Sequence, residues 1–338
     1  MSRGARRRQR QQPRTLQVFL IIVLVLLTVC VLVKAFFLKA PEQKAAELPA
    51  QPAASDTDDS QQSREEQAAQ EALRSHLERK GGFYTILLSG LDDDNGGSDT
   101  NILVAVDTVN GYVYGVSIPR DSKAIIGGKA RKINYAYNKG GTELLADTVS
   151  EQLGIPVDYT VSVNLKGFTA LVDAIGGVDF DVPINMDYDD PIQNLSIHFK
   201  KGVQHLSGAD ALRVVRFRHN NDGSGYGSED LGRMATQQKF LKAVAKKMLS
   251  AGNILTKIDD YAKIFNQYVD TNLTVGNLAW LGTEVLKMGV DKIDFSTLPN
   301  AWKYPYIYLD PAETLTLVNT YLNPYVEDRT AEDLHLPS

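Results

Sequence analysis

The longest apolar run of the chain lies near its N-terminus, from Leu16 to Leu38. At about 1.5 Å per residue, a helix of this length measures about 34 Å, which is enough to cross a hydrocarbon core of roughly 30 Å. Six arginines and no acid occupy the first fourteen positions, which orients the N-terminus toward the cytoplasm. We therefore expect a cytoplasmic basic tail over 1–15, a single transmembrane helix over 16–38 and an extracytoplasmic remainder. A cleaved signal peptide is the alternative, but its apolar region is usually shorter.

The stretch that follows has few large apolar side chains. Residues 40–62 are rich in Ala, Pro, Gln, Ser and Asp, a composition typical of a tether because it buries too little surface to offset ordering entropy. Ser63 and Glu66 form a capping-box pattern before a short helical repeat that Gly81 and Gly82 can end. Residues 39–82 are thus predicted to be a linker with a short helix.

From residue 83 onward, short apolar or alternating runs are followed by helical repeats. Apolar runs of four to eight residues between Asp/Gly-rich turns indicate strands, and spacings of three and four indicate helices. The expected strands are Tyr84–Leu88, Asn101–Val106, Tyr112–Ile118, Tyr159–Val163, Val178–Val182 and Ile293–Leu298. The expected helices are Thr142–Leu153, Leu165–Ile175, Ser228–Leu249, Ile254–Val269, Val275–Met288 and Pro311–Leu322. This alternation predicts an α/β domain over 83–338 with helices packed on a mixed central sheet.

Composition and charge exclude several classes of protein. The chain has 338 residues, 43% of them hydrophobic and 23% charged, which is ordinary for a globular protein. One cysteine supplies neither an internal disulfide nor a zinc cluster. Beyond residue 14, 30 basic residues face 41 acidic ones, and this acidic excess argues against nucleic-acid binding. The sequence also lacks the nucleophile-elbow, phosphate-loop and zinc-protease motifs.

Two acids flank the loop between the first two expected strands. Asp92 closes one strand and Asp99 opens the next, so both can face one point. Hard carboxylates in this arrangement suit Mg²⁺ or Mn²⁺ that takes its other ligands from water and substrate phosphates. An ordinary Asp-rich turn is the alternative.

Arginines also gather at the ends of expected elements. Arg120 and Asp121 directly follow a strand, and Arg216 and Arg218 flank Phe217 after Val214-Val215. Strand periodicity would place both of these guanidinium groups on one face and the phenyl ring in the core.

The fourth arginine is expected on a helix. Arg233 and Gln237 are four residues apart, so they share a helix face. Each arginine alone is explained by a surface salt bridge, but four together favour a site for a multiply charged phosphate.

The same residues lie in a series of blocks that resembles one family. In order, the blocks are SGLD (89–92), SDT (98–100), SIPRD (117–121), KINYAY (132–137), GG-x-ELL (140–145), GF-x-x-LVDAIGGVDFDVP (167–183), MDYDDP (186–191), KG-x-QHL-x-G-x-x-AL-x-x-VRFR (201–218) and LGR-x-x-x-QQ (231–238). They closely resemble the LytR-CpsA-Psr family of bacterial envelope proteins, and the resemblance covers about residues 83–250.

This resemblance implies an extracytoplasmic α/β/α domain, with helices on both faces of the sheet, anchored in the cell membrane by one span. It also implies transfer of a glycopolymer, such as teichoic acid or capsular polysaccharide, from a polyprenyl-pyrophosphate carrier onto peptidoglycan. Carried over by motif, Asp92 and Asp99 look like magnesium ligands, with Asp121 as a supporting residue. Arg120, Arg216, Arg218 and Arg233 look like a pyrophosphate clamp, with Lys132 and Gln237 at its rim.

The resemblance further implies an apolar cavity for the polyprenyl tail. Candidates for its walls, with plain core residues as the alternative, are Leu144, Leu145, Val149, Phe168, Leu171 and Val172.

One position departs from the family pattern. Gly97 stands where the family usually has an arginine before Ser-Asp-Thr. Arg131 or Lys129, in the loop after PRD, is a candidate to compensate. Two other functions therefore stay open: a carrier or polymer binder with reduced or lost catalysis, and a pyrophosphatase that acts on the lipid carrier.

Overall fold

The computed structural model describes residues 38–44, 76–91, 97–192, 195–227, 229–248, 250 and 258–338. The predicted span over 16–38, apart from Leu38, lies outside these ranges, as do Asp92 and the helix expected after Ser63. Within the described ranges, no helix has both the length and the apolar character needed to cross a membrane.

A six-stranded mixed sheet forms the centre of the molecule, with strand order β11-β6-β1-β2-β3-β12. Neighbouring strands run antiparallel except for β1 with β6 and β3 with β12, which are parallel. Its strands are β1 (Phe83–Leu91), β2 (Ser98–Asp107), β3 (Tyr112–Ile118), β6 (Tyr159–Asn164), β11 (Val269–Thr271) and β12 (Ile293–Thr297). The expectation of a mixed α/β domain is confirmed.

Helices cover both faces of this sheet, and the strands bury side chains on both faces. Leu87 and Leu103 pack against α3 (Asn134–Leu153), α10 (Pro311–Leu317) and the π-helical turn η2 (Val318–Leu322). On the opposite face, Ile86 and Ile102 pack against α9 (Val275–Met288) and part of α6 (Glu229–Met248). Successive strand residues therefore alternate between two apolar cores, which explains the nearly continuous apolar runs in the sequence.

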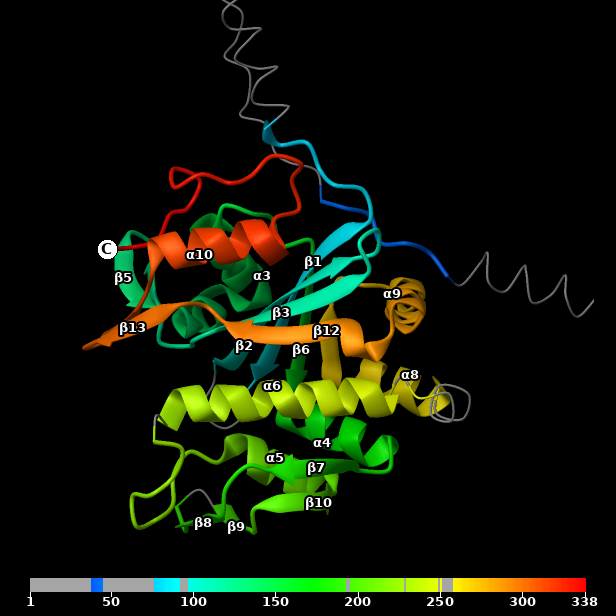
Figure 1. Ribbon diagram of the computed structural model, residues 1–338, viewed down its shortest axis with the longest axis vertical. Coiled ribbons are helices and arrows are strands. Elements are labelled where there is room, and N and C mark those ends of the chain that lie inside the picture. Colours follow the sequence, from blue (N-terminus) through cyan, green and yellow to red (C-terminus); the bar gives the residue numbers. More distant parts are fainter. Residues whose placement is uncertain are drawn as a thin grey trace, which may run out of the picture.

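A second lobe lies below the sheet in Figure 1 and has a separate apolar core. Long helix α6 separates the two parts: Phe240 lies in the second-lobe core, whereas Leu241 packs against the sheet. The other elements of this lobe are α4 (Leu165–Ala174), β7 (Val178–Val182), β8 (Met186–Asp190), β9 (Leu195–Phe199), β10 (Gly202–Leu206) and α5 (Gly208–Arg216). Helix α8 (Ile258–Tyr268) packs on α4.

Two short hairpins near the C-terminal half of β3 were not predicted from the sequence. They are β4 (Lys123–Ile126) with β5 (Lys129–Lys132), and β13 (Asn300–Lys303) with β14 (Tyr306–Leu309). The predicted helix over 142–153 begins earlier, at Asn134, but it is kinked by non-helical backbone at Gly140 and Gly141. Its predicted end is confirmed, because Gly154 adopts the left-handed conformation that ends a helix.

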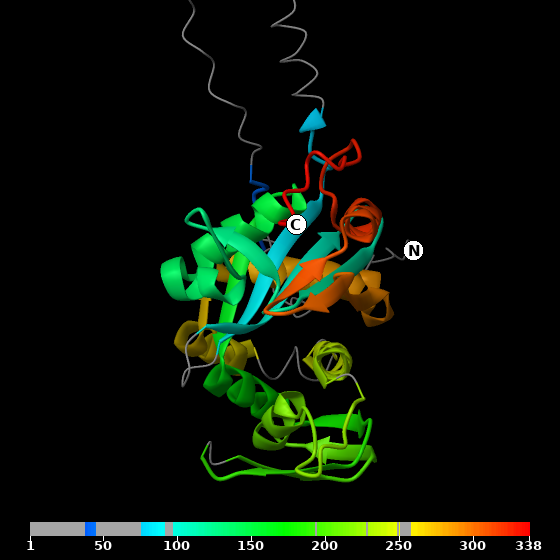
Figure 2. The same ribbon diagram turned by 90° about the vertical axis from the view of Figure 1, so that its left-hand side faces the viewer.

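The described parts of the linker contact the domain. The backbone N–H of Lys44 donates to Asp158 Oδ1 at 3.0 Å, and Arg79 Nη2 lies 2.8 Å from Asp158 Oδ2. The Gln43 amide donates to the carbonyl oxygen of Phe83 at 2.7 Å. Residues 43 and 44 of the predicted linker are thus hydrogen-bonded to folded elements. Figure 2 shows the described N-terminal and C-terminal segments at the same end of the molecule.

Candidate active site

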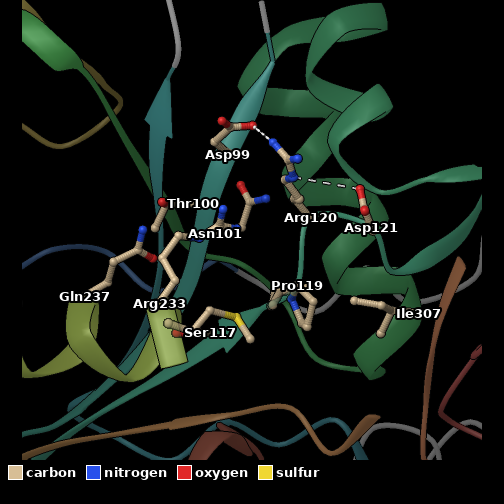
Figure 3. A pocket seen from close by; sticks show the side chains of 12 residues that line it. Asp99, Thr100, Asn101, Ser117, Pro119, Arg120, Asp121, Arg233, Gln237 and Ile307 are labelled. Carbon is tan, nitrogen blue, oxygen red and sulfur yellow. Dashed lines mark hydrogen bonds and ion pairs between the residues drawn. The ribbon is translucent and has the colours of Figure 1, made fainter. Parts of the chain in front are cut away.

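A polar pocket lies where the N-terminal end of β2 meets the C-terminal end of β3. It has an empty volume of about 410 Å³ and is open to solvent. Five of the predicted site residues line it together: Asp99, Arg120, Asp121, Arg233 and Gln237. They come from β2, from the turn after β3 and from α6, so residues 138 positions apart in the sequence share one site (Figure 3). Its other lining residues are Thr100, Asn101, Ser117, Ile118, Pro119, Met234 and Ile307.

Strand register explains the closest ion pair in the pocket. Asn101 lies opposite Ile118 in the antiparallel β2–β3 ladder. This is the last pair of the ladder, so Asp99 at the start of β2 and Arg120 in the turn after β3 both lie just beyond it, at the same end of the two strands. Arg120 Nη1 lies 2.7 Å from Asp99 Oδ1, and both side chains are partly exposed. The end of the ladder thus brings this pair of opposite charges together at the mouth of the pocket.

The Asp121 carboxylate forms ion pairs with the two basic residues near the turn, Arg120 and Lys132. Its Oδ2 lies 3.2 Å from Lys132 Nζ, and its Oδ1 lies 3.9 Å from Arg120 Nε. The carbonyl oxygen of Asp121 accepts a hydrogen bond of 3.0 Å from the backbone N–H of Ile307. Lys132 is not a lining residue, so it contacts the site through Asp121.

Helix α6 brings Arg233 and Gln237 to the opposite wall of the pocket, as their spacing predicts. The Gln237 amide donates to the Val215 carbonyl oxygen at 3.0 Å, which joins α6 to the end of α5.

The adjacent residue, Gln238, was not predicted to position the site. Its amide nitrogen lies 2.9 Å from Ser117 Oγ, 2.8 Å from the Ser296 carbonyl oxygen and 3.0 Å from Thr297 Oγ1. Ser117 lines the pocket, so Gln238 fixes α6 against β12 and against β3, one of the strands that border the site. The QQ pair in the sequence was the available signal, since consecutive helical residues point in different directions.

The glycine-rich loop over 223–227 is also fixed to α6 at one point. Tyr226 packs edge-on against Phe217, and its hydroxyl lies 3.0 Å from Thr236 Oγ1. A Cβ at position 232 would overlap the Tyr226 side chain, so Gly232 is required for this close approach. Burial raises the pKa of Tyr226, more than the hydrogen bond with Thr236 lowers it, so the hydroxyl stays neutral. The other residues of the loop are exposed.

The predicted arrangement of Arg216 and Arg218 on a strand is wrong. Arg216 is the last residue of α5, and Phe217 follows it as an extended C-cap residue. Basic residues in a last helical turn interact favourably with the helix dipole, which is a structural reason for Arg216. Phe217 is buried as predicted, with 1% of its surface exposed. Neither arginine is among the residues that line the pocket, so their place in a phosphate clamp stays a prediction.

The missing arginine at position 97 has a backbone explanation. Gly97 has a φ of +101°, and a Cβ there would lie 3.1 Å from Asn138 Oδ1. Residues other than glycine rarely adopt this backbone conformation, so position 97 does not suit an arginine. The suggested substitutes do not line the pocket either: Arg131 lies over the ring of Tyr135 at 5.5 Å, and Lys129 is exposed.

The proposed lipid-cavity residues divide between two cores. Leu144, Leu145 and Val149 pack in the core on the α3 face of the sheet. Phe168, Leu171 and Val172 pack in the second lobe. They do not form one wall, and the structure favours plain core roles for the fully buried members, Leu145, Val149 and Val172.

Asp99 is the one predicted metal ligand that the structure describes, since Asp92 lies outside the described residues. No group of three or more His, Cys, Asp or Glu side chains suited to a metal occurs in the part of the chain that was described. Mg²⁺ commonly takes only one or two protein carboxylates and completes its shell with water and phosphate oxygens. Asp99, which is 45% exposed at the pocket mouth, fits that type of site.

These features coincide with a match to a known family. The model of the LytR_cpsA_psr family matches residues 49–322, so this chain belongs to that family. The resemblance seen in the sequence motifs is thereby confirmed.

Two relatives with assigned names come from Bacillus species. Polyisoprenyl-teichoic acid–peptidoglycan teichoic acid transferase TagV of Bacillus subtilis (strain 168) is 37% identical over 202 residues, which cover 57% of this chain and 50% of TagV. The corresponding transferase TagU of Bacillus cereus (strain ATCC 14579) is 38% identical over 195 residues, covering 56% of this chain and 60% of TagU. The matched regions thus span about half to three fifths of these relatives.

Solved structures share the fold over more of the chain. The crystal structure of B. subtilis TagV matches with a TM-score of 0.60 and 32% identity, covering 71% of this chain and 96% of that chain. The structure of TagT bound to LI-WTA matches with a TM-score of 0.58 and 25% identity, covering 72% of this chain and 91% of that chain.

Proposed function

We propose that this protein transfers a glycopolymer, of the teichoic acid or capsular polysaccharide type, from a polyprenyl-pyrophosphate carrier onto peptidoglycan. The observation that carries the proposal is the shared pocket of Asp99, Arg120, Asp121, Arg233 and Gln237. The names of TagV and TagU, which describe transfer of teichoic acid to peptidoglycan, support the choice of substrates.

The reaction exchanges one phosphorus–oxygen bond for another. A peptidoglycan hydroxyl oxygen bonds to the phosphorus that carries the glycopolymer, and the bond from that phosphorus to the polyprenyl phosphate breaks. The hydroxyl proton leaves with the polyprenyl phosphate. Phosphoryl transfer depends mainly on positioning and charge stabilisation, so the protein needs cations at fixed places more than a nucleophile.

The pocket supplies fixed cations from two directions. Arg120 approaches from the turn after β3, held by Asp99 and Asp121, and Arg233 approaches from α6. Guanidinium groups bind phosphate oxygens bidentately, so the two together can grip a pyrophosphate. Lys132 and Asp121 orient Arg120, and Gln237 presents an amide at the rim.

Magnesium is part of the proposal. Asp99, with Asp92 as the second predicted carboxylate, would hold Mg²⁺ or Mn²⁺, which supplies positive charge to the pyrophosphate. Asp99 Oδ1 is 2.7 Å from Arg120, and its partial exposure leaves the carboxylate accessible from the pocket.

We also propose that the protein is anchored in the cell membrane by residues 16–38, with the domain outside. The apolar run and the arginine-rich tail support this topology. Protease added to intact protoplasts is then expected to digest the region after Lys39, and protection of that region would refute it.

Substitution of Asp99 tests the site. Asp99→Ala is expected to abolish metal-dependent transfer, measured with a polyprenyl-pyrophosphate-linked donor and peptidoglycan acceptor, while the melting temperature changes little. The structural reason for the small stability effect is that a partly exposed ion pair contributes at most about 1 kcal/mol.

A matched control is Asp294→Ala, which removes an exposed carboxylate 3.1 Å from Lys242 outside the pocket. It is expected to leave transfer unchanged. Retained activity in Asp99→Ala with a large loss of stability would contradict the proposal. Release of polyprenyl phosphate without transfer in the unchanged protein would favour the pyrophosphatase alternative.

A further inference from the structure

The β13–β14 hairpin, residues 300–309, presents large aromatic side chains to solvent. Trp302 is 59% exposed and Tyr304, at the turn, is 86% exposed. Among the described residues, the two strands pair with each other, and Ile307 also forms an isolated bridge with Ser122. Strand β13 projects from the body of the fold in Figure 1. Exposed aromatic rings grouped on one short element commonly mark a binding surface.

Register connects this aromatic hairpin to the pocket. Trp302 lies directly opposite Ile307 in the antiparallel ladder, so their side chains share a face. Ile307 lines the pocket, and its N–H is hydrogen-bonded to the carbonyl oxygen of Asp121. Trp302 is therefore on the same face of the hairpin as a residue that lines the pocket.

The neighbouring β4–β5 hairpin adds positive charge. The Tyr306 hydroxyl donates to the Ala130 carbonyl oxygen at 3.2 Å, and Lys123 Nζ lies 4.9 Å from the centre of the Tyr308 ring. Residues 122–133 and 300–309 contain no acid, although the chain as a whole is acidic. Their basic residues are Lys123, Lys129, Arg131, Lys132 and Lys303. Of these, Lys132 is paired with Asp121 and Lys123 donates to the Ser338 carbonyl oxygen. The aromatic hairpin thus lies in a locally basic region.

This combination matches one kind of polymer. The negative face of an aromatic ring attracts the C–H groups that line the flat face of a pyranose, and Trp offers the largest such face. Basic side chains pair with carboxylates along the same polymer. We propose that the aromatic hairpin binds a peptidoglycan glycan strand, with sugar rings on Trp302 and Tyr304 and peptide carboxylates near the basic residues.

A teichoic acid polymer and a membrane surface both fit the aromatic hairpin less well than a peptidoglycan strand does. A polyol-phosphate chain, as in teichoic acids, has charge but few flat sugar faces for a tryptophan. Residues 38–44, where the predicted membrane span would join the domain, lie on the opposite side of the molecule from the β13–β14 hairpin (Figure 1). The hairpin therefore faces away from the predicted membrane attachment. The identification of the bound glycan as the acceptor of the transfer reaction rests on the proposed function, whereas glycan binding by the hairpin does not.

Intrinsic fluorescence provides a direct test in the full-length protein in detergent. The chain has two tryptophans, and Trp280 packs edge-on against Tyr84 at 5.7 Å. Titration with soluble uncrosslinked peptidoglycan strands is expected to change the fluorescence of the unchanged protein. Trp302→Phe is expected to lose most of that change while it keeps binding, measured by calorimetry, within a few-fold of the unchanged protein.

Trp302→Ala is expected to raise the Kd for the strands about tenfold, which corresponds to about 1.4 kcal/mol. Val203→Ala, at a 75% exposed position on β10 in the second lobe, is the matched control and is expected to bind normally. Equal affinity of Trp302→Ala and the unchanged protein would overturn the proposal. The same Trp302-dependent signal from teichoic acid polymer, or from anionic vesicles without glycan, would also overturn it.

Release of polyprenyl phosphate, measured on the same variants, separates this inference from the proposed function. Trp302→Ala is expected to keep donor cleavage and to need more peptidoglycan for half-maximal transfer. If the unchanged protein cleaves no donor, the proposed function fails, and the binding titration still decides whether the hairpin holds glycan.

Discussion

Replacement of Gln238 by leucine tests whether α6 is fixed to the sheet as the structure indicates. The Gln238 amide has two hydrogens and three acceptors within 3.0 Å, from Ser117, Ser296 and Thr297. At about 1 kcal/mol for each of two bonds, with a further cost for acceptors left without a donor, the loss is about 2–3 kcal/mol. For a domain of this size we expect the melting temperature to fall by about 5–10 °C.

Gln237→Leu is the matched comparison one residue away. Its amide makes one described hydrogen bond, to the Val215 carbonyl oxygen, so the expected loss is about 1 kcal/mol, or about 2–4 °C. Because Gln237 lines the pocket, this variant is expected to lose more transfer activity for each degree of lost stability than Gln238→Leu.

Thermal melts followed by circular dichroism, with transfer assays well below the transition, measure both quantities. A Gln238→Leu variant that melts within about 2 °C of the unchanged protein would show that α6 is held by its apolar packing and not by this amide. Equal losses of stability in the two variants would show that Gln238 contributes no more than Gln237, which also contradicts the assigned role.

Two further predictions concern acid stability and position 97. Burial raises the pKa of the Asp333 carboxyl. Hydrogen bonds from Thr330 and His76, together with the charge of Arg329, lower this pKa by more than burial raises it, so in the folded protein it lies below the usual 3.8. A carboxyl of this kind stabilises the fold above its unfolded pKa, and the stabilisation is lost as pH falls through the folded pKa. Urea unfolding is therefore expected to show Asp333→Asn less stable than the unchanged protein at neutral pH, with the difference shrinking below about pH 4; a difference that grows toward acid pH would contradict this. Gly97→Arg, which restores the family's residue, is expected to lower the melting temperature and not to raise transfer, because its φ of +101° strains any other side chain by about 1–3 kcal/mol. A more active and equally stable variant would show that the backbone adjusts freely.

The sequence predicts the central sheet and most of its helices because their signals are long and periodic. Apolar runs identify β1, β2 and β3 to within a few residues, and the end of α3 follows from Gly154. The hairpins β4–β5 and β13–β14 escape prediction because strands of four residues are too short to show a period. Their positions depend on contacts with distant segments, such as the Ile307 hydrogen bond to Asp121.

Prediction of the site succeeds where a residue's position follows from local geometry. Asp99 and Arg120 flank strands that pair in sequence, and Arg233 and Gln237 share a helix face, so motif and spacing bring them near one point. The failure at Arg216 has the opposite cause. The apolar residues of α5 fit both a short helix and a strand, and only the tertiary packing of Val214 and Phe217 in the second lobe decides between them.

If the proposed membrane anchor is present, the bonds at the start of the described chain determine how far the domain can move from the membrane. A 44-residue tether over 39–82, fully extended, would reach about 145 Å. The Lys39 carbonyl oxygen, however, accepts a hydrogen bond of 2.9 Å from the Asn277 amide, and Lys44 and Arg79 both bind Asp158. The predicted span ends at Leu38, so almost no chain is left between it and the folded body. With the anchor proposed above, a domain held this close to the bilayer would sample substrates at the lipid surface and reach into the wall only as far as its own dimensions allow.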